Sequence, residues 1–231
     1  MKLLTSLTAG LALTCGTGAA IAQDISAQGN EPFWRAEVEL MTFTLTRPDA
    51  EPLVLSVTDR AAMDGGGEII TAMTTSPALR AVLTLSPGPC SDTMADQTYP
   101  FDATVEMGDM TLSGCGGDPA ELLTAADPWM VTSIAGAAVL PETEVTMTFG
   151  EGDALSGSGG CNRYTALYEI TGEGVSIGSA AATRMACPDD ITGQEQVFLA
   201  ALEAVRSFDI AEDGSLLLIG PDGPIIEASA P

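Results

Sequence analysis

Two short stretches of the chain hold the residue types whose spacing could do chemistry. Residues 157–164 (Gly-Ser-Gly-Gly-Cys-Asn-Arg-Tyr) join a glycine run to a thiol and a guanidinium. Residues 183–188 (Thr-Arg-Met-Ala-Cys-Pro) again place an arginine near a cysteine. The glycine run lacks the Lys-Ser/Thr ending of a phosphate-binding loop. Glycines allow a tight turn and a close approach of two backbones, so the pattern favours a structural closure of a sheet at the cysteine.

Arg163 and Arg184 are the charged residues of these stretches. A disulfide between the two stretches would make their backbones neighbours. Two guanidinium groups at one place would suit an anion, such as a carboxylate or a phosphate headgroup. The simpler interpretation is that each arginine pairs with carboxylates nearby in the sequence, such as Glu169, Asp189 or Asp190.

The absence of histidine is the strongest argument against an enzyme. Ser-His-Asp and Cys-His sites need an imidazole base, and many zinc sites need imidazole ligands. The chain has no Cys-x-x-Cys spacing of a thiol oxidoreductase. Its 32 acidic residues make some pair of carboxylates inevitable, so such a pair says little. We therefore expect a non-catalytic protein without a metal or a cofactor, with a carboxylate-dependent hydrolase of cell-wall material as the alternative.

Residues 1–22 have the pattern of an export signal. Lys2 is followed by an uncharged, largely apolar segment and by the small-x-small cleavage site Ala-Ile-Ala that ends at Ala22. Cys15 offers a second route, because Leu-Thr-Cys loosely resembles a lipoprotein signal in which the cysteine is acylated. We expect cleavage after Ala22, and a location in the periplasm or the outer envelope. No later stretch is apolar for long enough to span a membrane.

Four cysteines remain after the signal, and an even number in an exported chain favours disulfides. They permit three pairings. We expect Cys90 with Cys115 and Cys161 with Cys187, because each pair then lies inside one predicted domain. Each bond would close a loop of about 25 residues and contribute about 3 kcal/mol to stability.

The chain is strongly acidic, with 32 acidic and 8 basic residues and a net charge of −24. Such a surface repels nucleic-acid phosphate, so a nucleic acid is not an expected partner. The simplest interpretation is a charge that keeps the protein soluble. Divalent cations or a cationic partner, such as a secreted enzyme that the protein inhibits, are the alternatives.

The elements that position all these residues are mainly short strands. Alternating apolar and polar side chains, separated by turn residues such as those at 86–89, predict antiparallel sheets. This spacing is typical of a sandwich or a small barrel. We expect strands at residues 34–40, 41–46, 53–57, 68–72, 79–85, 101–107, 110–113, 145–149, 154–158, 164–171, 175–177, 181–185, 208–211, 216–219 and 225–228.

One helix is expected at about residues 192–206. Thr192 and Glu195 match the S/T-x-x-E capping box at its start. Its buried stripe would consist of apolar residues at three-and-four spacing. These are Phe198, Ala201, Leu202 and Val205.

The chain divides at a segment rich in glycine, proline and aspartate. We expect a β-rich domain at residues 24–118, a linker at 119–127 and a second domain at 128–231. The fold class is mainly β, with a helix in the second domain.

The second domain carries a motif that consists of Gly160, Cys161, Asn162, Tyr164, Thr183, Met185, Ala186 and Cys187. With Trp129 and the Gln194–Glu195 pair, it resembles the META domain, the family of the heat-inducible lipoprotein HslJ, over about residues 128–228. The resemblance implies a curved sheet or open, cracked barrel around one helix, similar to secretin-pilot lipoproteins that hold acyl chains. It implies no catalytic residue.

The first domain carries the sequence Gly-Asn-Glu-Pro-Phe-Trp at residues 29–34, Cys-x-Asp-x-Met at 90–94 and Gly-Cys-Gly at 114–116. These resemble an uncharacterised family of bacterial lipoproteins and membrane-associated proteins. We therefore expect an envelope protein that supports envelope integrity or stress tolerance by binding a lipid, another hydrophobic ligand or a protein partner.

Overall fold

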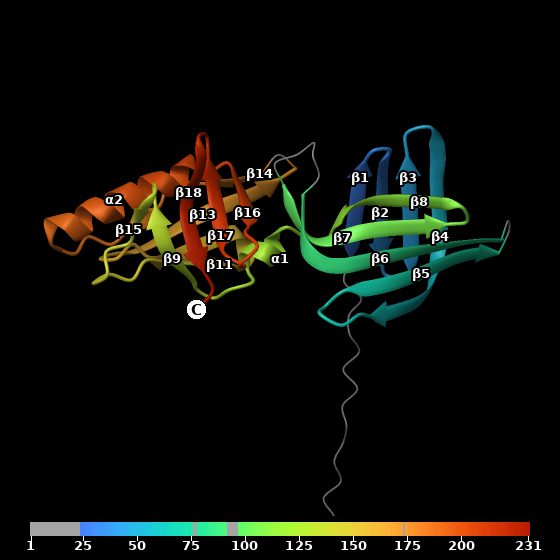
Figure 1. Ribbon diagram of the computed structural model, residues 1–231, viewed down its shortest axis with the longest axis horizontal. Coiled ribbons are helices and arrows are strands. Elements are labelled where there is room, and N and C mark those ends of the chain that lie inside the picture. The colour runs from blue at the N-terminus through green and yellow to red at the C-terminus, as the bar shows by residue number, and fades with distance from the viewer. Residues whose placement is uncertain (1–23, 76–77, 92–96, 173) are drawn as a thin grey trace, which may run out of the picture.

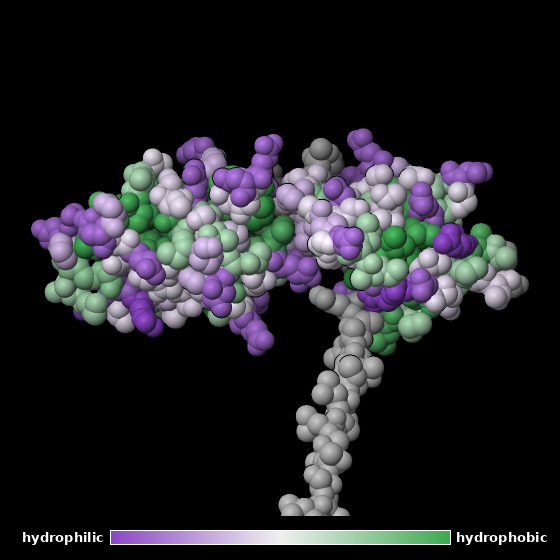
Figure 2. Space-filling model, turned by 60° about the horizontal axis from the view of Figure 1, so that its bottom comes forward, coloured by the Kyte–Doolittle hydropathy of each residue, from purple (hydrophilic) through white to green (hydrophobic). Residues whose placement is uncertain are grey.

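The computed structural model describes residues 24–75, 78–91, 97–172 and 174–231. The predicted signal at residues 1–22, with Cys15, lies outside the described residues, as does the Asp-x-Met part of the first-domain motif. Two β-rich bodies lie side by side along the long axis of the molecule (Figure 1). Hydrophilic side chains are spread over the visible face of both (Figure 2).

The first body is a closed antiparallel barrel of eight strands. Each strand pairs with the next, and β1 closes the barrel by pairing with β8. Alternate side chains point inward and form a core that includes Trp34, Phe43 and Leu83, all at most 1% exposed. The strands are β1 (Ile25–Asn30), β2 (Phe33–Glu39), β3 (Thr42–Arg47), β4 (Ala50–Ala62), β5 (Glu68–Thr75), β6 (Ala78–Ser91), β7 (Thr98–Met107) and β8 (Met110–Gly116).

The glycines of the first-domain motif lie at the closing seam of the barrel. A Cβ at Gly29 would collide with the indole of Trp34, whose Nε1 donates to the carbonyl of Ser113 at 3.1 Å. A Cβ at Gly114 would collide with the carbonyl of Gln28. Strands β1 and β8 can therefore approach each other only because these positions lack side chains.

The turn predicted at residues 86–89 is wrong, because β6 continues through it. The register against β7 shifts between Pro87 and Cys90, as at a β-bulge. A bulge leaves a residue without its ladder partner, so proline is tolerated there. The Cys90–Cys115 disulfide, with a Cα–Cα distance of 5.5 Å, joins this bulged end of β6 to β8.

The second body is an antiparallel sheet with the strand order β14-β13-β12-β11-β9-β18-β17-β16. The short strand β10 pairs with β9, and β15 pairs with β13. Helix α2 lies along this sheet (Figure 1). The strands are β9 (Trp129–Ile134), β10 (Ala137–Ala138), β11 (Thr146–Gly150), β12 (Ala154–Ser158), β13 (Arg163–Thr171), β14 (Gly174–Ile177), β15 (Ala181–Ala182), β16 (Ser207–Ile210), β17 (Leu216–Gly220) and β18 (Gly223–Ser229).

Helix α2 (Asp189–Ala204) begins earlier than expected, and the predicted capping box is wrong. Pro188 is its N-cap and makes no side-chain cap hydrogen bond. Thr192 instead lies in the first turn, where its hydroxyl contacts the carbonyl of Cys187 at 3.5 Å. Asp189 and Asp190 occupy the first turn, where negative charge interacts favourably with the helix dipole.

The segment between the two bodies is folded. It contains the short helix α1 (Ala120–Leu123), and Leu123 is fully buried in the core of the second body. The indole Nε1 of Trp129 donates to the carbonyl of Leu123 at 2.7 Å. The bodies also touch directly, since the Thr98 hydroxyl on β7 contacts the Asp209 carboxylate on β16 at 3.2 Å. No helix in the described part of the chain is long and apolar enough to cross a membrane.

Candidate functional site

The two stretches that drew attention in the sequence meet at a disulfide in the second body. Cys161 follows β12, Cys187 precedes α2, and their Cα atoms lie 6.3 Å apart. This is the pairing expected from the sequence, as is Cys90 with Cys115. Next to the bond, the backbone N–H of Thr183 donates to the carbonyl of Arg163 at 3.0 Å.

Asn162 is the centre of a hydrogen-bond network beside this disulfide. Its backbone N–H and its side-chain Nδ2 donate to the two carboxylate oxygens of Glu195, both at 2.7 Å. Its Oδ1 accepts from the Thr183 hydroxyl at 2.9 Å and from the backbone N–H of Met185 at 2.8 Å. Asn162 is 7% exposed and Glu195 6% exposed. One amide side chain therefore ties together three separate segments, and a buried carboxylate is satisfied by its hydrogen bonds.

The glycines of the motif make room for this network. A Cβ at Gly159 would lie 2.6 Å from Oε1 of Glu195. A Cβ at Gly157 would collide with the carbonyl of Thr146, which also accepts a hydrogen bond from the Tyr164 hydroxyl at 3.0 Å. Gly160 has a φ of +101°, which other residues rarely adopt. Ala186 is exposed, and nothing in the described residues explains its place in the motif.

A hollow of about 960 Å³ lies next to the disulfide, on the outward-facing side of β11, β12 and β13. Six of its thirteen lining residues are serine or threonine, whose small side chains carry hydroxyl groups. Arg163 and Met185 border it beside the disulfide. Its remaining lining residues are Pro128, Glu144, Thr146, Thr148, Ser156, Gly157, Ser158, Cys161, Tyr164, Thr165 and Thr183.

Arg163 and Arg184, which the sequence analysis places at one site, do not share a site in the structure. Arg163 lines the hollow and Arg184 does not. The ion pairs expected with Glu169, Asp189 or Asp190 are absent from the described residues, where the salt bridges join other residues. Each guanidinium is exposed to solvent and has no partner in the described part of the chain. A single arginine, rather than a pair, is thus available in the hollow.

Residues 121–229 match the family model of the META domain. This part of the chain is a META domain. No curated protein matches the chain. A solved structure, the NMR structure of a protein from Burkholderia xenovorans, shares 25% identity over 48% of this chain and 87% of its own, with a TM-score of 0.40.

In the META domain, the Gln194–Glu195 pair has a role that the local pattern did not indicate. Glu195 holds Asn162, and Gln194 holds the loop before β11. The Oε1 of Gln194 accepts from the backbone N–H of Leu140 at 2.7 Å, and its Nε2 donates to the Thr143 hydroxyl at 3.0 Å. The only sequence feature that could have indicated these long-range contacts is the pair of consecutive polar residues on the helix.

Side chains fill the space between α2 and the sheet of the META domain. Phe198 and Leu202 on α2 are fully buried, and the Phe198 ring lies edge-on to Tyr164 with centroids 5.4 Å apart. Burial raises the pKa of the Tyr164 hydroxyl. This packing is the core of the domain, so it does not support the expectation that an acyl chain lies there.

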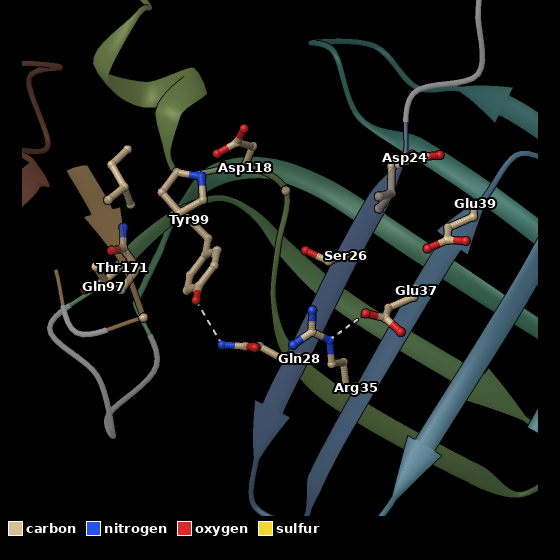
Figure 3. A pocket seen from close by; sticks show the side chains of 15 residues that line it. Asp24, Ser26, Gln28, Arg35, Glu37, Glu39, Gln97, Tyr99, Asp118 and Thr171 are labelled. Atoms are coloured by element: carbon tan, nitrogen blue, oxygen red, sulfur yellow. Dashed lines mark hydrogen bonds and ion pairs between the residues drawn. The ribbon is translucent and has the colours of Figure 1, made fainter. Parts of the chain in front are cut away.

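A second cavity, of about 580 Å³, lies between the barrel and the META domain (Figure 3). Four of the five charged residues in its lining are carboxylates, namely Asp24, Glu37, Glu39 and Asp118, and the fifth, Arg35, pairs with Glu37 at 3.0 Å. The Gln28 amide donates to the Tyr99 hydroxyl across it at 2.9 Å. Among the described residues, no group of three or more cysteine or carboxylate side chains is arranged to hold a metal ion.

Proposed function

We propose that this protein is a non-catalytic, exported envelope protein that supports envelope integrity or stress tolerance by binding. The META domain and the two disulfides support this proposal, since disulfides persist in oxidising, extracytoplasmic compartments. A structural role of the motif is supported by its hydrogen bonds, because Asn162 bonds to both Glu195 and Thr183.

The observation that carries the proposal is the unpaired Arg163 in the hollow. In a chain with 32 acidic residues, a guanidinium without a carboxylate partner remains free to bind an external anion. Arginine presents five donors in a planar fork that matches carboxylate and phosphate groups. The binding group of the envelope component is therefore anionic, and the hollow, rather than the interior of the META domain, receives it.

Cosedimentation of the mature protein with isolated bacterial cell envelopes tests this proposal. We expect the wild-type protein to be retained and Arg163→Gln to be retained less. Arg184→Gln is the matched control, because this residue is also exposed and unpaired but lies outside the hollow. Equal retention of all three proteins, or no retention of the wild type, would overturn the proposal.

Inhibition of a secreted cationic enzyme is a second candidate function. It is favoured by the net charge of −24 and by the carboxylates of the cavity between the domains. Opposite charges steer two proteins together, and salt weakens this attraction. An immobilised sample should retain lysozyme-like proteins at physiological salt if this function holds, and their free passage would exclude it.

The hydrolase alternative would use two of the same carboxylates. It requires a pair of acids on either side of a bound glycan. Asp118 lies across the cavity from Asp24 and Glu39 (Figure 3). Release of soluble fragments from purified cell wall, lost in Asp118→Asn, would support it, and intact cell wall after prolonged incubation would count against it.

A further inference from the structure

The chemistry of the hollow narrows the class of its ligand. Side chains of adjacent strands that point to the same face lie in rows. On the outward face, Thr148 of β11 pairs with Ser156 of β12, which pairs with Thr165 of β13. Ser158 pairs with Arg163 one row further along. The base of the hollow is therefore a row of hydroxyl groups that ends near a guanidinium.

These hydroxyl groups have unused hydrogen-bonding capacity. Each hydroxyl offers one donor and two acceptor positions. Ser156 and Thr165 make no hydrogen bond through their side chains within the described residues. Ser158 accepts from the backbone N–H of Gly160 at 3.2 Å and can still donate. Thr148 donates to Asp127 at 3.1 Å and can still accept. Such a surface suits a ligand with many hydroxyl groups of its own.

The walls of the hollow add a charge and an apolar surface. Arg163 supplies an unpaired cation, and Glu144 an exposed carboxylate that can accept from ligand hydroxyls. Met185, which is 64% exposed, and Pro128 supply apolar contacts of the kind that the C–H faces of a sugar ring make. A volume of about 960 Å³ is at the upper end of the range for small-molecule sites.

We propose that the hollow binds an anionic carbohydrate, that is, a sugar ring with a carboxylate or phosphate group that Arg163 holds. The row of hydroxyl groups disfavours an acyl chain, which would leave their donors and acceptors unsatisfied. This inference rests on the proposed function and names its ligand class. The same chemistry occurs in a uronic-acid polysaccharide and in a phosphorylated sugar of a lipid headgroup, so both sources enter the test.

Isothermal titration calorimetry of the mature protein with defined probes tests the inference. The probes are digalacturonate and glucose 1-phosphate. Digalacturonate represents the uronic-acid polysaccharide, and glucose 1-phosphate represents the phosphorylated sugar of a lipid headgroup. We expect binding of at least one probe, weakened about tenfold or more in Arg163→Gln, since a charge-assisted bidentate contact is lost. Ser156→Ala with Thr165→Ala should weaken it less, and Arg184→Gln should leave it unchanged.

Two controls keep the result specific. Maltose, a neutral sugar, and acetate, an anion without a ring, should each bind at least about tenfold more weakly than the better probe. Equal binding of maltose, equal binding by Arg163→Gln, or no binding of either anionic sugar would overturn the inference. If Arg163→Gln reduces envelope retention while the anionic sugars neither bind nor compete, the proposed function stands and the ligand class is wrong. Unchanged thermal unfolding of Arg163→Gln shows that the variant is folded.

Discussion

Glu195, seven residues into α2, holds both the backbone N–H and the side-chain amide of Asn162 at 2.7 Å. This contact joins residues that lie 33 positions apart and fixes the loop that carries the disulfide. The motif of the META domain therefore connects its helix to its sheet by hydrogen bonds. The same hydrogen bonds fix the position of Arg163 in the neighbouring hollow, because Arg163 follows Asn162 directly.

Replacing Glu195 should be among the most destabilising single changes in the META domain. Glu195→Ala leaves two buried donors of Asn162 without an acceptor, which costs about 2–4 kcal/mol. Urea denaturation of the mature protein measures this loss. Glu169→Ala, an exposed carboxylate on β13, is the control and should change stability by less than about 0.5 kcal/mol. Similar losses for the two variants would contradict the structural role of Glu195.

Two glycine substitutions should have effects of opposite sign. Gly159→Ala brings a Cβ to 2.6 Å from the Glu195 carboxylate and should destabilise the protein by about 1–3 kcal/mol. Gly193→Ala lies on α2 with nothing within 4 Å of the new Cβ, so it should stabilise by about 0.5–1 kcal/mol. Thermal unfolding of both variants, side by side, checks the signs. A stabilising Gly159→Ala would contradict the close packing of Gly159 against Glu195.

Both disulfides should form in the exported protein. Non-reducing peptide mapping should recover one peptide pair with Cys90 and Cys115 and another with Cys161 and Cys187. Each bond closes a loop of about 25 residues, so replacing either pair by serine should lower stability by about 3 kcal/mol. A cross-linked peptide that joins Cys90 or Cys115 to Cys161 or Cys187 would contradict the fold.

The stability of the META domain should fall in alkaline solution. Burial raises the pKa of Tyr164 above its ordinary value of 10.0, because the ionised phenol would lie in the core. The folded protein then holds this proton more tightly than the unfolded chain. The stabilisation is complete below about pH 10 and is lost as the pH rises through the folded-state pKa.

Tyr164→Phe separates this effect from general alkaline unfolding. The variant loses the hydrogen bond to Thr146 and should be about 1 kcal/mol less stable at pH 7. Its melting temperature should fall less steeply than that of the wild type above pH 10. Parallel curves for the two proteins would show that another group governs the alkaline transition.

Most strands and the apolar stripe of α2 were predictable, because alternation and three-and-four spacing are local properties of the sequence. Strands β1 and β9 were not predicted. For β1, the glycine, asparagine and proline that follow Gln28 indicate a turn rather than a barrel seam. The contact of Glu195 with Asn162 was missed because local spacing matched a capping box. The hollow could not be predicted either, since it depends on which outward side chains are small where three strands meet.

The short helix α1 also decides where the chain can be divided. The last hydrogen bond of the barrel, from the N–H of Gly117 to the carbonyl of Ser26 at 2.9 Å, lies only two residues before the helix N-cap. Leu123 completes the core of the META domain and accepts from Trp129. A fragment that began at residue 128 would expose that core and leave the indole unsatisfied. An autonomous META fragment should therefore start at Asp118. Two residues span at most about 7 Å, so the barrel and the META domain remain close neighbours.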